Sequence, residues 1–201
     1  MKRPKFIFVG GINGSGKTTI LNLVAASNKE VSVIKGSKIF MKWLGIKRGN
    51  YKKLQSLPDK KVLMEQEKMI HYLVKKRRFG RSKKIVLIDA HYVNIREERV
   101  QGWVGDWLSM MSGLALIKAS PTDILRRIEY DENESIRKRS VFAIHTNNKH
   151  KLKLVGVFNR KSDRVFRKFA RMYNKPNKVF INKKGQSGRV AKRLNEFLAS
   201  I

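Results

Sequence analysis

Short apolar runs alternate along the chain with longer segments in which apolar residues recur every three or four positions. The short runs are rich in β-branched and aromatic residues, which is typical of buried strands. They predict strands at residues 6–9, 31–34, 85–88, 114–118 and 179–181. The periodic segments predict helices at residues 17–27, 36–44, 58–80, 120–128, 140–173 and 190–198. Strands that alternate with helices predict a three-layer α/β/α fold with a five-stranded parallel sheet.

A few segments follow neither pattern. Residues 47–58 are expected to form a basic connector, residues 103–111 a short helix or a substrate-covering segment, and residues 129–139 a loop or lid. A break in the long helix is expected near Asn147 or Gly156. Residues 1–201 are expected to form one domain, a size that suits a single α/β core.

A glycine-rich segment joins the first predicted strand to the first predicted helix. Residues 11–18 read Gly-Ile-Asn-Gly-Ser-Gly-Lys-Thr and match the phosphate-binding motif G-x-x-x-x-G-K-[ST]. Its glycines allow the backbone to turn successive N–H groups towards an anion, and the helix start adds the positive end of its dipole. This context predicts ATP binding, with Lys17 reaching the β- and γ-phosphates. The expected nucleotide-binding residues are Gly11, Asn13, Gly14, Ser15, Gly16, Lys17, Thr18 and Thr19.

An acidic residue, Asp89, directly follows the apolar strand at residues 85–88. In a chain with a phosphate-binding loop, such a residue is predicted to hold Mg²⁺, directly or through water, together with the Thr18 hydroxyl. The loop and Asp89 both follow strands, and ligands bind at the carboxyl ends of strands in open α/β sheets. His91 is a candidate for orienting Asp89 or a substrate, or it is an ordinary surface residue.

Composition adds an unusual charge. Lys and Arg total 46 against 15 acids, a net charge of +31, and residues 137–193 hold 19 basic residues and one acid. Two interpretations stay open: a polyanion-binding face, expected to bind RNA, or a compositional bias with solvated lysines. Cysteine is absent, which excludes disulfides and sulfur-based zinc sites. The chain has neither a long apolar span nor a signal-like apolar run, so a cytoplasmic location without membrane contact is expected.

These motifs, with Gly36-Ser37, Asp89-Ala-His91 and the arginines that follow the fourth strand, resemble those of the archaeal-type adenylate kinases. That family belongs to the nucleoside monophosphate kinase group of P-loop proteins, and the likeness covers nearly the full length. It implies an acceptor-binding segment at about residues 35–80 and a lid at about residues 129–150. It further implies that Arg127, Arg137 and Arg139 close over the transferring phosphoryl group, and that Gly36, Ser37, Lys52 and His91 serve the acceptor. Lys52 stands where the family has an arginine-containing patch.

The leading hypothesis is therefore an ATP- and Mg²⁺-dependent nucleoside monophosphate kinase that acts on AMP. One alternative is a kinase-like ATPase that acts as an RNA- or ribosome-associated assembly factor. Another is a P-loop kinase with a different acceptor. The oligomeric state is left open by the sequence.

Overall fold

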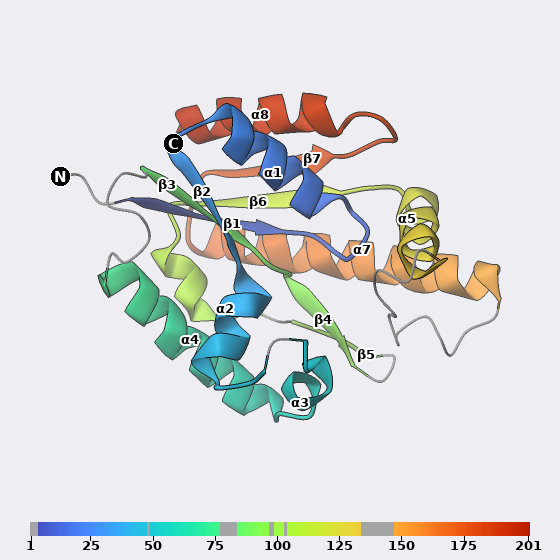
Figure 1. The fold of residues 1–201 in the computed structure, drawn as a ribbon, viewed down its shortest axis with the longest axis horizontal. Coiled ribbons are helices and arrows are strands. Elements are labelled where there is room, and N and C mark those ends of the chain that lie inside the picture. The colour runs from blue at the N-terminus through green and yellow to red at the C-terminus, as the bar shows by residue number, and fades with distance from the viewer. Residues whose placement is uncertain (1–3, 48, 77–83, 97–98, 103, 134–146) are drawn as a thin grey trace.

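The computed structural model describes residues 4–47, 49–76, 84–96, 99–102, 104–133 and 147–201. Its centre is a five-stranded, all-parallel sheet with strand order β2-β3-β1-β6-β7 (Figure 1). The strands are β1 (Lys5–Gly10), β2 (Val31–Lys35), β3 (Ile85–Asp89), β6 (Gly113–Lys118) and β7 (Asn177–Ile181). The predicted fold class and all five predicted strands are confirmed.

Helices cover both faces of the sheet, as Figure 1 shows. Helices α1 (Lys17–Ser27) and α8 (Ser187–Ala199) lie on one face, where Ile20, Leu21 and Leu194 pack against strand residues such as Val9 and Phe180. The other face is covered by α2 (Gly36–Trp43), α4 (Asp59–Lys76) and α7 (Asn148–Met172). Because both faces are covered, the central strands are apolar along almost their whole length.

The order of the strands fixes where the site lies. Strand β1 pairs in parallel with β3, and Val9 lies opposite Asp89 in the register. The loop after β1 and the acid at the end of β3 therefore meet at the same edge of the sheet. Strand β6 lies on the other side of β1 and carries α5 (Pro121–Asn133) to this edge.

Three elements of the described chain, one helix and two strands, differ from the sequence-based expectations. The basic connector contains a short helix, α3 (Tyr51–Gln55), because the Asn50 side chain caps the Lys53 N–H and Leu54 is buried. Strands β4 (Val93–Arg96) and β5 (Arg99–Gly102) form an antiparallel pair that was not predicted. Both are too short and too charged to show a clear apolar pattern. Residues 103–111 were expected to form a short helix or a substrate-covering segment, and they contain a 3-10 helix, η1 (Asp106–Met110).

Helix boundaries differ at the predicted lid. The loop expected from residue 129 is wrong for residues 129–133, which continue α5, because no Gly or Pro interrupts the helix there. Of the two positions at which a break in the long helix was expected, Asn147 and Gly156, the helix is not broken at Gly156. Helix α7 runs through it, held by buried Val155 and Phe158 on either side. It begins after Asn147, which caps its first turn. The predicted helix end near residue 80, the lid at residues 134–146 and Trp103 lie outside the described residues.

No helix among the described residues is long and apolar enough to cross a membrane.

Candidate active site

The loop at residues 11–16 adopts backbone conformations that side chains disfavour. Gly14 and Gly16 have φ values of +76° and +85°, in the left-handed region. A Cβ at Gly16 would also collide with the side-chain amide of Asn182. The loop is therefore packed from behind while its front remains open, which leaves a cradle for a phosphate group at the start of α1.

Two side chains from later in the sequence, Asn182 and Arg127, hold this loop. Asn182, fully buried just after β7, donates from Nδ2 to the Ser15 carbonyl at 2.9 Å. Its Oδ1 accepts from the Ser187 hydroxyl at 3.3 Å. Arg127 on α5 donates from its guanidinium to the Gly14 carbonyl at 3.1 Å and to the Asn182 carbonyl at 3.5 Å. These bonds fix the two loop carbonyls, so that the loop N–H groups are held in place before a ligand binds.

Lys17 is almost fully buried at the mouth of the loop, with 6% of its surface exposed. Its ammonium donates to the Gly11 carbonyl at 2.9 Å and lies 3.9 Å from a carboxylate oxygen of Asp89. A buried charge needs such partners, because desolvation without them costs several kcal/mol. These partners hold the ammonium at the position where a phosphate would meet the loop.

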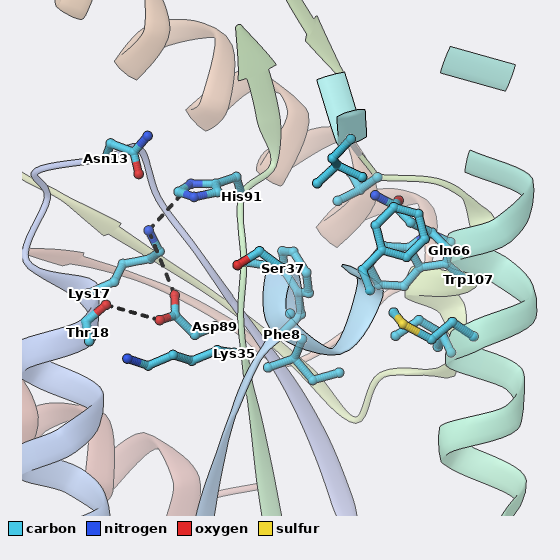
Figure 2. Close-up of a pocket in the computed structure, with 18 residues that line it drawn as sticks. Phe8, Asn13, Lys17, Thr18, Lys35, Ser37, Gln66, Asp89, His91 and Trp107 are labelled. Atoms are coloured by element: carbon cyan, nitrogen blue, oxygen red, sulfur yellow. Dashed lines mark hydrogen bonds and ion pairs between the residues drawn. The ribbon is translucent and has the colours of Figure 1, made fainter. Parts of the chain in front are cut away.

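Thr18 and Asp89 lie beside Lys17, and we call these three residues the polar centre. The Thr18 hydroxyl donates to Oδ2 of Asp89 at 3.2 Å (Figure 2). One hydroxyl and one carboxylate are the oxygen donors that Mg²⁺ accepts in proteins when water and phosphate oxygens complete its shell. Among the described residues there is no group of three or more His, Cys, Asp or Glu that could hold a metal by itself. The donor set fits a magnesium ion that arrives with a nucleotide.

His91 closes the other side of Lys17. Its Nδ1 lies 2.6 Å from the Gly11 carbonyl and 3.5 Å from the Lys17 ammonium. With a proton on Nδ1, the ring donates to the same carbonyl that Lys17 uses. The next residue, Tyr92, is fully buried under Gly10 and donates to the Ala115 carbonyl at 3.1 Å. Burial holds the pKa of Tyr92 well above its usual value, so the phenol stays neutral and rigidly supports the loop.

A cavity of about 450 Å³ opens from this polar centre towards α2 and α4. Figure 2 shows Lys17, Thr18, Asp89 and His91 at one end, Gln66 and Trp107 at the other, and Ser37 between them. The lining between the ends is mostly apolar and comprises Phe8, Phe40, Leu54, Met69, Ile70, Ile88, Ala90 and Val104. At the far end Gln66 is buried, and the buried indole N–H of Trp107 has no hydrogen-bond partner among the described residues.

The family model described as an AAA domain (AAA_17) matches residues 10–145, about two thirds of the chain. The chain belongs to this family. Its matched region contains the phosphate-binding loop, Asp89 and the whole lining of the cavity apart from Phe8. No curated protein sequence is significantly similar to the chain.

Solved structures show a similar fold at low sequence identity. Shikimate kinase from Acinetobacter baumannii, in complex with shikimate, is 12% identical with a TM-score of 0.56, covering 98% of this chain and 94% of that one. The protein TT1252 from Thermus thermophilus is 16% identical with a TM-score of 0.58, covering 100% and 99%. Shikimate kinase from Bacteroides thetaiotaomicron is 14% identical with a TM-score of 0.58, covering 97% and 98%. These structures share the three-layer α/β/α P-loop fold of this chain.

The structure brings together most of the residues predicted from the sequence. Seven of the predicted site residues that the structure describes line the cavity: Asn13, Lys17, Thr18, Gly36, Ser37, Asp89 and His91. Thr19 is exposed on α1, and Ser15 is buried beneath the loop. Lys52 is exposed on α3 and is not part of the lining. Arg137 and Arg139 lie outside the described residues.

Several neighbouring residues were not predicted. These residues belong to no recognisable motif, because each is a single polar or aromatic residue in a segment whose pattern is typical of ordinary core or surface. They are Lys35, Gln66, Trp107 and Asn182. One signal was available for Lys35, since it ends β2 at the edge of the sheet where Asp89 ends β3. The tertiary packing alone reveals the other three.

Proposed function

We propose that the protein transfers the γ-phosphoryl group of Mg-ATP to a nucleoside monophosphate bound in the cavity beside the loop, with AMP as the favoured acceptor. The observation that carries this proposal is the cavity itself. It begins at Lys17, Thr18 and Asp89 and leads into an apolar chamber with two polar groups at its far end. Its volume falls within the range of known ligand pockets, about 300–1,000 Å³.

The far end of the cavity supports a heterocyclic base as the acceptor's recognition group. A base has apolar faces and a polar edge, and the walls offer apolar side chains such as Phe40 and Met69. Gln66 and Trp107 line this end, and the Gln66 amide would bond that edge. A polyhydroxylated acid would need more polar partners than this chamber offers.

The near end supports phosphoryl transfer. Lys17 and Lys35 supply positive charge on either side of Asp89, and Ser37 offers a hydroxyl towards the middle of the cavity (Figure 2). Among the described lining residues there is no arginine, so the acceptor phosphate would meet lysine point charges rather than a bidentate fork. Arginines 127, 137 and 139 remain predicted to stabilise the charge that develops in transfer.

The roles of the residues follow from this geometry. The loop N–H groups and Lys17 would bind the ATP phosphates, while Thr18 and Asp89 would hold Mg²⁺. The metal supplies charge neutralisation at the phosphate oxygens. His91 would position Lys17 and the Gly11 carbonyl. Phosphoryl transfer needs positioning and charge more than a covalent catalyst, and this site offers both.

The test is turnover of Mg-ATP with AMP, CMP, GMP, UMP and shikimate, beside a control that contains ATP alone. We expect AMP to be converted to ADP, the Lys17→Ala variant to lose at least about a thousandfold in kcat/KM, and an exposed control, Lys42→Ala, to retain activity. Phosphorylation of shikimate alone, or of none of these acceptors, would contradict the proposal. ATP hydrolysis without any acceptor would instead favour an ATPase that acts on RNA-containing particles, for which the basic α7 is the supporting observation.

A further inference from the structure

Helix α7 carries a line of arginines on the side away from the sheet. Its inner face buries Phe158, Phe166 and Phe169, whereas Arg160, Arg164, Arg167 and Arg171 are all exposed. Their spacings of four, three and four residues put them on one face of the helix. We call these four residues the arginine row. At 1.5 Å per residue it is about 16 Å long.

The row lines an open groove of about 740 Å³ together with Asp163, Lys168 and Met172. Asp163 is the only acid among these lining residues, and it is shared between Arg167 at 3.3 Å and Lys118 at 3.6 Å. Like charges at spacings of three and four residues repel one another and weaken a helix. Repulsion among the four arginines therefore destabilises the helix, and a bound polyanion would relieve that repulsion.

We infer that the arginine row binds double-stranded RNA through its phosphate backbone. Guanidinium groups bind phosphate oxygens in a bidentate manner, which lysine cannot do. A nucleic-acid duplex carries a dense, regular array of phosphates, whereas an acidic protein presents scattered carboxylates. Four regularly spaced guanidinium groups on one helix face suit the regular array.

The way in which α7 is packed against the protein favours duplex RNA over single strands and duplex DNA. Single strands are bound largely by stacking of bases on aromatic rings, and the aromatic rings of α7 face the core. A helix must enter the major groove to read B-form DNA, whereas α7 is held on its inner side by β6 and the β4–β5 pair. Duplex RNA offers a wide, shallow minor groove flanked by phosphates, which an embedded helix can approach from outside.

The row lies apart from the residues of the proposed kinase site, and the inference does not depend on that site. The triple variant Arg160→Gln/Arg164→Gln/Arg171→Gln keeps the Arg167–Asp163 pair. The matched control is Lys42→Gln/Lys47→Gln/Lys60→Gln, which removes the same charge from exposed positions around α2 and α4. Circular dichroism and thermal unfolding of both variants check that they are folded.

The experiment is the fluorescence anisotropy of a labelled 20-base-pair RNA duplex, titrated with each protein from 50 to 200 mM salt. We expect the row variant to bind at least about tenfold more weakly than wild type at 100 mM salt, and the slope of log K against log salt to flatten by about 2–3. The control variant should change affinity by less than about threefold. Three outcomes would overturn the inference: equal losses in both variants, binding of duplex DNA as tight as that of RNA, or no RNA binding at low salt.

Discussion

We predict that loss of the hydrogen bond from Asn182 to the phosphate-binding loop lowers both the stability of the protein and its affinity for ATP. The Asn182→Ala variant keeps the backbone bonds of residue 182 but removes both bonds made by its side chain. The Ser15 carbonyl is then left buried without the 2.9 Å donor that it has now. The Ser187 hydroxyl, which is only partly buried, can turn to water instead.

The expected magnitude follows from these two losses. An unsatisfied buried carbonyl costs about 1–3 kcal/mol, and the long bond to Ser187 adds a few tenths. We expect the free energy of unfolding to fall by about 2 kcal/mol, which lowers Tm by about 4–8 °C for a chain of this size. The loop also loses its fixed geometry, so the KM for ATP should rise about tenfold, equivalent to about 1.4 kcal/mol, while kcat changes less.

Urea unfolding and steady-state kinetics measure both effects on the same preparation. The matched control is Asn195→Ala on α8, whose amide bonds the Ser27 hydroxyl at 3.0 Å far from the loop. It should lose some stability without any change in the KM for ATP. The proposed role of Asn182 in holding the loop is wrong if the free energy of unfolding of Asn182→Ala falls by less than about 0.5 kcal/mol and its KM for ATP equals that of wild type.

Three further predictions concern other parts of the structure. Gly16→Ala should abolish ATP binding, measured by calorimetry, because the φ of +85° and the contact with the Asn182 amide both oppose a Cβ; near-wild-type affinity would contradict this. Gln66→Leu should raise the KM for the monophosphate about tenfold and leave the KM for ATP unchanged, since a buried polar partner is lost only in the acceptor chamber; equal effects on both substrates would refute the assignment. Tyr173 donates to Asp106 at 2.7 Å, and its pKa is raised to about 12 by burial and by that carboxylate. The folded state therefore binds the proton more tightly than the unfolded state, and this contribution to stability is lost as the pH rises from about 10 to 12. Tyr173→Phe should lose about 1 kcal/mol near pH 8 and flatten that alkaline decline in chemical denaturation; an unchanged pH profile would speak against it.

The sheet could be predicted because buried parallel strands are continuous apolar runs bounded by turn residues. Each of the five runs fits a buried strand better than any other element. The ends of the strands then place the loop beside Asp89. The phosphate-binding loop could be predicted because its glycines, Lys17 and Thr18 are adjacent in the chain and serve one ligand. Both are local patterns.

The remaining features depend on distant partners. Gln66 on α4 and Trp107 in η1 meet only when both elements pack over the sheet, and neither residue signals this from its neighbours. Asn182 reaches a loop carbonyl that lies 167 positions earlier in the sequence. The α3 helix and the β4–β5 pair were missed because capping and packing, rather than periodicity, stabilise them.

The destination of the phosphoryl group tests the central claim most directly. Wild-type protein would be incubated with Mg²⁺, ATP labelled at the γ-phosphate and an equimolar mixture of the four nucleoside monophosphates, and the products would be separated by chromatography. The account predicts that the label moves into a nucleoside diphosphate, chiefly ADP, and that Lys17→Ala abolishes this transfer. Label found only in inorganic phosphate, or still in ATP, would contradict the account.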